Sequence, residues 1–219
     1  MKSRILILVA ALFLLNSCIV KSLQPFYTKA VVSYNETLKG SWKDQKNRTW
    51  EIISFKEEWE KETDPNTKLS KEDKDTYERY KDGYYIGFRT KKTEAGFIGM
   101  PFKVNEHLFI DFTPFEYGSN ELNGLAAGHL LKTHSVAYVE IGEDASITLK
   151  WLSEKAINHL IRENKLRIKH EKTGIDDDLV LTATSEELHN FLKKFIALDF
   201  DSKWDNDDIY TLKPSNARP

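Results

Sequence analysis

The sequence predicts an α+β domain, in which an antiparallel sheet or partly closed β-barrel carries two amphipathic helices packed on it near the carboxyl end. Short runs with strand-like alternation follow one another from Gly40 to Trp151. The spacers between them are too short for the crossover helices that parallel strands need. Helical spacing of apolar residues appears only after Trp151. With 40% hydrophobic residues, we expect one α+β domain over residues 37–213.

The clearest strand is Ile147–Trp151, where Ile147, Leu149 and Trp151 alternate with polar residues. This pattern is typical of a strand with one face buried. The same reasoning predicts strands, including one hairpin between the two helices, at residues 49–56, 84–89, 98–104, 108–112, 166–170, 179–182 and 209–212.

Two helices are predicted towards the carboxyl end. The first runs from Ser153, which can cap it, to about Asn164. The second begins at Thr184, which forms a capping box with Glu187. Its apolar residues repeat at helical spacing, at Leu188, Phe191, Leu192, Phe195 and Ile196.

The segment from Lys56 to Tyr80 is unusually rich in charge. Fifteen of its 25 residues are charged, and both signs are mixed along it. Such a composition is typical of a solvated surface segment. We therefore expect a loop or a frayed helix between two strands.

The amino end has the form of a secretory signal peptide over residues 1–17. Lys2 and Arg4 precede an uncharged run of 11 residues, Ile5–Leu15. That run suits a signal sequence and is too short for a membrane span, which takes about 20 residues. A plain signal peptide and a signal anchor are the alternatives.

The next residues, Leu15-Asn16-Ser17-Cys18, resemble the lipobox of bacterial lipoproteins. The resemblance implies cleavage before Cys18, a diacylglycerol thioether on its sulfur and a further acyl chain, such as palmitate, on the new amino end. Cys18 is the only cysteine, so an intramolecular disulfide is excluded. Because two or more acyl chains anchor a protein stably, the membrane is the first predicted partner.

Residues 18–36 are expected to form the lipidated cysteine and a tether, in which Phe26 and Tyr27 dock on the body. Residues 22–28 and the Leu-x-Gly-x-Trp element at 38–42 resemble a group of envelope lipoproteins of unassigned function. In this class the residues behind the cysteine steer sorting, and Ile19-Val20 lacks the aspartate that retains lipoproteins in the inner membrane. We therefore expect the outer membrane of a bacterial cell envelope, and a disordered tail over residues 214–219.

Gly40-Ser41-Trp42 resembles the Gly-x-Trp motif on the first strand of lipocalins, whose Trp plugs the closed end of a ligand barrel. The alternative is a Trp that packs a sheet against a helix. If a barrel closes, the candidate residues that line its cavity are Trp50, Tyr84, Phe88, Phe97, Phe102, Phe109 and Phe112.

The charge balance and motifs exclude several functions. With 32 basic and 34 acidic residues, the chain has no basic excess for nucleic acid. Six histidines (107, 129, 134, 159, 170 and 189) show no metal-ligand spacing, and His159 and His189 are predicted to lie on the surface. The acidic residues at 199–207 lack an EF-hand pattern. No catalytic, metal or cofactor residue is assigned.

The sequence thus predicts a non-catalytic binding or scaffolding module. The alternative is a lipocalin-like carrier of a small apolar ligand. A scaffold would expose an apolar patch, expected at Phe115–Leu131 or Phe26-Tyr27, and the leading surface for an envelope partner is the Gly118–His129 loop.

Overall fold

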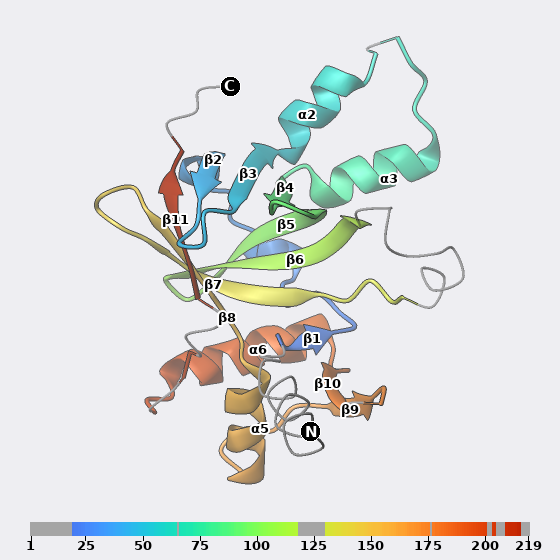
Figure 1. Ribbon diagram of the computed structural model, residues 1–219. Helices are drawn as coiled ribbons and strands as arrows, with labels where there is room; N and C mark the ends of the chain where they lie inside the picture. The colour runs from blue at the N-terminus through green and yellow to red at the C-terminus, as the bar shows by residue number, and fades with distance from the viewer. Residues whose placement is uncertain are drawn as a thin grey trace, which may run out of the picture.

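Eight antiparallel strands form a closed barrel in the order β11-β2-β3-β4-β5-β6-β7-β8 (Figure 1). The computed structural model describes residues 19–64, 66–117, 130–175, 177–200, 203–204 and 209–215. This architecture confirms the α+β class and the barrel. The strands are β2 (Gly40–Lys43), β3 (Thr49–Ser54), β4 (Tyr84–Arg89), β5 (Glu94–Val104), β6 (His107–Tyr117), β7 (Ser135–Ile141), β8 (Ile147–Trp151) and β11 (Ile209–Pro214).

Strand β11 closes the barrel. It pairs with β8 from Ile209 to Leu212 and with β2 at Lys213 and Pro214. The other seven strands follow one another in chain order, so closure depends on a strand from the far end of the chain. The predicted strand at 209–212 is confirmed and extends to Pro214.

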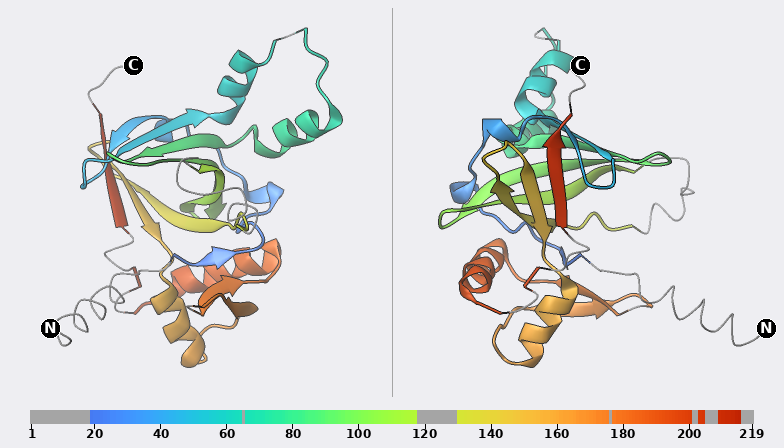
Figure 2. Two further views of the ribbon diagram at one scale, coloured as in Figure 1. Left: turned by 45° about the vertical axis from the view of Figure 1, so that its right-hand side comes forward. Right: turned by 60° about the vertical axis from the view of Figure 1, so that its left-hand side comes forward.

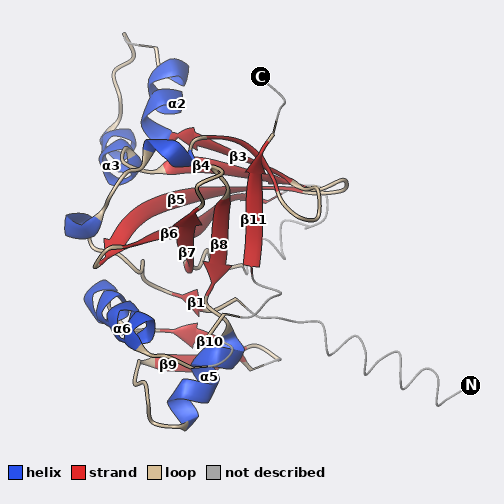
Figure 3. Ribbon diagram, turned by 90° about the vertical axis from the view of Figure 1, so that its left-hand side faces the viewer, coloured by secondary structure: helices blue, strands red, loops and turns tan. Residues whose placement is uncertain are grey.

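A second layer packs against the outer face of the barrel (Figures 2 and 3). It holds a three-stranded sheet in the order β1-β10-β9 and two helices. Both predicted helices are confirmed, and Thr184 and Glu187 form the capping box. A hairpin does lie between them, but its first strand is His170–Thr173 and not the predicted 166–170. Ser153 precedes the first helix without a side-chain cap bond. The elements are β1 (Lys21–Ser22), α5 (Glu154–Arg162), β9 (His170–Thr173), β10 (Asp178–Leu181) and α6 (Ser185–Ala197).

The core between the two layers is apolar. Phe102 and Phe109 project from the outer face of the barrel and stack on each other with ring centroids 5.7 Å apart. Leu188 and Leu192 of α6 are fully buried in the same cluster. The barrel wall is therefore buried on both faces along β5 and β6, which explains their long apolar runs.

The charged segment forms two helices, α2 (Phe55–Glu62) and α3 (Lys71–Tyr80), so the predicted loop or frayed helix is wrong. Ser54 and Ser70 cap them through their side chains. Aromatic residues turn one side of this pair towards the outer face of the barrel, where Phe55 packs with Ile98 and Met100. The charged side chains lie on the solvent side. The composition of the segment did not reveal the few aromatic residues, such as Phe55 and Trp59, that pack against the barrel.

The amino-terminal segment, residues 19–33, joins the two layers. Val20 is fully buried, and its N–H donates to Leu152 O at 3.1 Å. β1 then pairs in parallel with β10, and further on the Ser33 N–H donates to Pro101 O at 2.9 Å. The segment contains one short 3-10 helix, η1 (Lys29–Val31). A second, η2 (Glu36–Leu38), lies between the segment and β2.

Candidate functional site

The interior of the barrel is filled with aromatic and branched side chains. Trp42, Trp50 and Trp151 are 6%, 4% and 5% exposed. Of the predicted cavity-lining residues, five belong to this interior cluster, namely Trp50, Tyr84, Phe88, Phe97 and Phe112. Phe102 and Phe109 were wrongly predicted there, because they face the second layer.

Trp42 lies inside the barrel. It stands opposite Trp50 across β2 and β3, and its Nε1–H donates to Leu38 O at 3.1 Å. The alternative in which this Trp packs a sheet against a helix is therefore wrong. The bond ties η2 to the first strand of the barrel, so η2 is held at that end.

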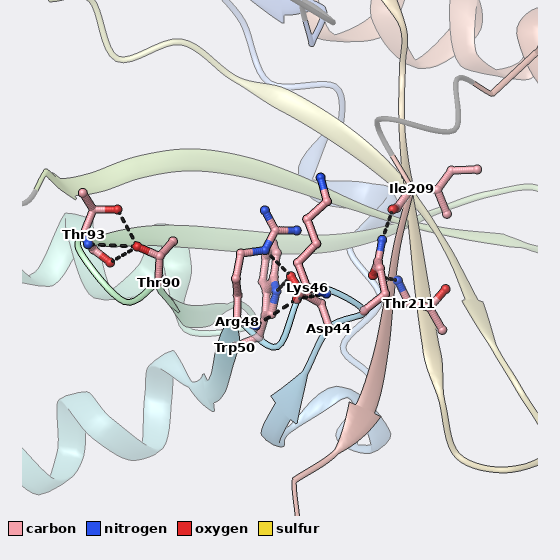
Figure 4. A network of polar contacts seen from close by, with 9 residues as sticks. Asp44, Lys46, Arg48, Trp50, Thr90, Thr93, Ile209 and Thr211 are labelled. Carbon is pink, nitrogen blue, oxygen red and sulfur yellow. Dashed lines mark hydrogen bonds and ion pairs between the residues drawn. The ribbon is translucent and has the colours of Figure 1, made fainter. Parts of the chain in front are cut away.

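A polar network closes the opposite end of the barrel, at the turn between β2 and β3 (Figure 4). The Asp44 side chain is fully buried and accepts hydrogen bonds from Arg48 Nε at 2.6 Å and Trp50 Nε1 at 3.1 Å. The N–H groups of Lys46 and Arg48 donate to the same carboxylate at 2.9 and 3.0 Å. The chain thus satisfies a buried charge with four local donors.

These bonds set the pKa of the Asp44 carboxyl. Burial alone would raise this pKa, but the hydrogen bonds from the Arg48 N–H, the Trp50 indole and the Arg48 side chain outweigh it. The pKa of Asp44 therefore lies below its usual range. The carboxylate is charged at neutral pH and pins the turn.

Arg48 covers the aromatic interior at this end. Its guanidinium carbon lies 4.7 Å from the ring centroid of Tyr210 and 5.2 Å from that of Phe88. The Nη2 atom of Arg48 is buried and has no hydrogen-bond partner in the described part of the chain. The guanidinium is stabilised there by its contacts with the Tyr210 and Phe88 rings. Gln45 joins β11 to the same turn through Ile209 O and the Thr211 N–H.

A second buried carboxylate, Asp111, holds the amino-terminal segment. Asp111 is 0% exposed on the outer face of β6 and accepts the Phe26 N–H at 2.8 Å. Its other oxygen lies 2.7 Å from His134 Nδ1, which is also 3.0 Å from Thr113 Oγ1. The backbone of His134 pairs with Ser22 in both directions. This cluster fastens residues 22–26 to the barrel.

The remaining predicted positions are scattered. His189 is 7% exposed beside Phe102, so its predicted surface position is wrong, whereas His159 is half exposed beside Glu163. Cys18, the Gly118–His129 loop and Asp201, Asp205 and Asp207 lie outside the described residues. Within the described ranges, no three His, Cys, Asp or Glu side chains converge as metal ligands. No helix in those ranges is both long and apolar enough to cross a bilayer.

The apolar patch predicted at Phe115–Leu131 is exposed at the residues that the structure describes there. Phe115, Leu130 and Leu131 are 47%, 47% and 68% exposed at the two edges of the predicted patch. Phe26 is instead fully buried, so the other predicted patch is wrong at that residue. The docking of Phe26 on the body agrees with the expectation for the tether.

Two hollows lie outside the barrel. One, of about 400 Å³, runs between α6 and residues 166–169. The other, of about 230 Å³, lies over the outer faces of β3, β4 and β5 and is lined by Glu51, Tyr85, Arg89, Glu94 and Phe115, among others. The second was missed from the sequence, where its signal is Gly87 in the middle of the predicted strand 84–89 and Gly96 just before the predicted strand 98–104.

The comparisons with known proteins give no relative. No family model, no curated protein and no solved structure matches the chain significantly. Function is therefore inferred from the residues of this chain and their geometry.

Two glycines on opposite faces of the barrel wall test how full the interior is. A Cβ at Gly99 would overlap Ile86 Cδ1 and lie 3.2 Å from Ile110 Cγ2, whereas at Gly87 its nearest neighbour is 3.9 Å away. We predict that Gly99→Ala lowers the free energy of unfolding by about 1–3 kcal/mol through overpacking. Gly87→Ala is the matched control and should be neutral or slightly stabilising in urea unfolding. Equal stability of both variants would contradict a filled interior.

Asp44 should make stability depend on pH. Its folded-state pKa is lower than the unfolded value of about 3.9, so its stabilisation is complete above that pH and is lost as pH falls through the folded pKa. We predict that Asp44→Asn costs about 2 kcal/mol at pH 7 and that the difference from the parent shrinks below about pH 4. Urea unfolding at both pH values measures this. Exposed Asp82→Asn should change the free energy of unfolding by less than about 0.5 kcal/mol, and a pH-independent cost at Asp44 would refute the assignment.

Proposed function

We propose that this protein is an exported bacterial lipoprotein, anchored in the outer membrane by lipid on Cys18, whose body is a non-catalytic binding module. The observation that supports the proposal is that the residues directly after Cys18 are bound to the domain. Ile19 bridges to Ser153, and Val20 is buried next to it. A lipid on Cys18 would therefore lie next to residues that belong to the folded body.

The amino-terminal segment would then mount the body close to the bilayer. Lys21 forms an ion pair with Asp178 at 2.5 Å, and Ser22 is bonded on both sides, to His134 and to β10. Only Ile19 and Val20 would lie between a lipid on Cys18 and strand β1. Such a mount fixes which side of the molecule faces the lipid, which suits a protein that presents one surface to a partner.

The filled interior favours binding on the outer surface. Trp50 packs against Trp151 and Tyr210 at centroid distances of 6.2 and 5.5 Å, and Arg48 covers that end. A carrier of an apolar ligand generally needs a preformed cavity of about 300 Å³ or more. An eight-stranded barrel is nevertheless compatible with the lipocalin-like alternative, so that alternative needs its own test.

Lipidation is tested at the lipobox. We predict that Cys18→Ala abolishes incorporation of labelled palmitate and leaves the signal sequence uncleaved, because both reactions need the sulfur. Ser17→Ala is the matched control and should be labelled like the parent, since alanine is also small. Labelling that persists in Cys18→Ala would remove the anchor from the proposal.

The carrier alternative is tested by native mass spectrometry of the full chain released from membranes in mild detergent. We predict a mass that corresponds to protein plus its covalent lipid alone, because Trp42, Trp50 and Trp151 occupy the interior. A second, non-covalent apolar molecule that stays bound in the parent and is lost in Gly99→Ala would instead establish the carrier function.

A further inference from the structure

We infer that the hollow on the outer face of β3, β4 and β5 is a binding site for an arginine side chain of a partner protein. The inference rests on the proposed binding function and names the surface that performs it. Its evidence is the juxtaposition of a glycine floor, an exposed phenylalanine at a β-bulge and an excess of carboxylates in a hollow of about 230 Å³.

The floor is backbone. Gly87 and Gly96 stand directly opposite each other in β4 and β5, and Glu51 stands opposite Gly87 on the other side. Gly87 has no positive φ, and a Cβ there would meet only ordinary contacts. Folding therefore does not require a glycine at this position. A glycine without a structural reason inside a strand often marks a place where a ligand approaches the backbone closely.

One wall is an exposed aromatic side chain at a β-bulge. Gly96 pairs with Glu116 and Phe97 pairs with Pro114, so Phe115 is the extra residue of β6. Bulges re-aim side chains next to functional sites. Phe115 is 47% exposed and meets Tyr85 edge-to-face, with centroids 5.6 Å apart. Tyr85 in turn stacks on buried Phe55 at 4.6 Å, so this wall is rigid.

The charge around the hollow is negative. Arg89 is engaged by Glu94 at 2.9 Å, whereas Glu51 makes no ion pair with any other residue that the structure describes. Negative charge from Glu62 and Glu58 of α2 also reaches Tyr85 and, after burial, contributes to raising the pKa of its hydroxyl. The cations nearby are Lys132, which donates to Phe115 O at 3.3 Å, and Lys61, which pairs with Glu58 at 3.1 Å. Among the residues that line the hollow itself, two carboxylates, Glu51 and Glu94, face one cation, Arg89.

A guanidinium fits these features together. It is planar, so it can lie flat on the glycine floor, and it stacks on aromatic rings while it donates to a carboxylate. A lysine ammonium would use the charge of Glu51 but gain less from the flat floor. An apolar side chain would use Phe115 and Tyr85 and leave Glu51 partly desolvated without a partner.

The test uses the full-length chain in detergent solution, labelled with ¹⁵N at its ten glycines. The probe is the peptide acetyl-Gly-Arg-Gly-amide, and the matched control probe carries neutral, isosteric citrulline. Loss of one signal in Gly87→Ala, and of another in Gly96→Ala, assigns the two floor resonances. We predict that both shift saturably with the arginine peptide and do not shift with citrulline.

Substitutions of residues that line the hollow test whether arginine binds there. Glu51→Gln and Phe115→Ala should each weaken binding by about five- to tenfold, whereas the exposed controls Glu171→Gln and Ile141→Ala should leave it unchanged. Equal shifts with both peptides, or shifts confined to other glycines, would overturn the inference while palmitate labelling at Cys18 still supported the anchor. Loss of that labelling with intact arginine binding would fault the proposed anchor instead.

Discussion

The whole arrangement depends on the backbone hydrogen bonds that residues 19–26 make to two different layers. Val20 donates to Leu152 at the end of β8, and β1 adds itself to β10 on the other side. Asp111 then holds the Phe26 N–H from the wall of the barrel. Because the Asp111 side chain is fully buried, removal of either partner would leave a buried polar oxygen without a hydrogen bond, which is costly. The amino-terminal segment is thus a structural part of the domain.

This constraint links the fold to the proposed role. A tether of free chain would let the body turn in any direction over a membrane. Here the residue after the predicted lipid site is already paired, so the orientation of the barrel would follow from the anchor. The outer face of β3 to β5 and the helix pair α2–α3 lie on the opposite side of the barrel from β1 and β9–β10 (Figure 3). The proposed arginine site would then face away from the lipid, where a partner can reach it.

Local signals predicted local structure well. The capping box at Thr184 fixed α6, and the alternation of Ile147, Leu149 and Trp151 identified an interior face. Alternation could not predict which side of the barrel wall Phe102 faces. Both sides of β5 and β6 are covered, so apolar residues occur on the inner and the outer side alike. His189 was misplaced because it is buried beside Phe102, although Glu187 and Lys193, charged residues near it in the sequence, are exposed. Closure by β11 depends on pairing with β2 and β8, which no local pattern encodes.

The different roles of Gly87 and Gly99 could not be predicted from the sequence. Gly87 and Gly99 both interrupt apolar strands, and their sequence contexts are alike. Gly99 is required by packing, since Ile86 and Ile110 already occupy the space that a Cβ would take. Gly87 borders no such neighbour and lies on the face where Glu51, Tyr85 and Phe115 surround a hollow. Only the direction in which each position faces separates a packing role from a binding role. Under the proposed binding function, a barrel that is full inside would use its outer wall to bind a partner, and Gly87 lines a hollow in that wall.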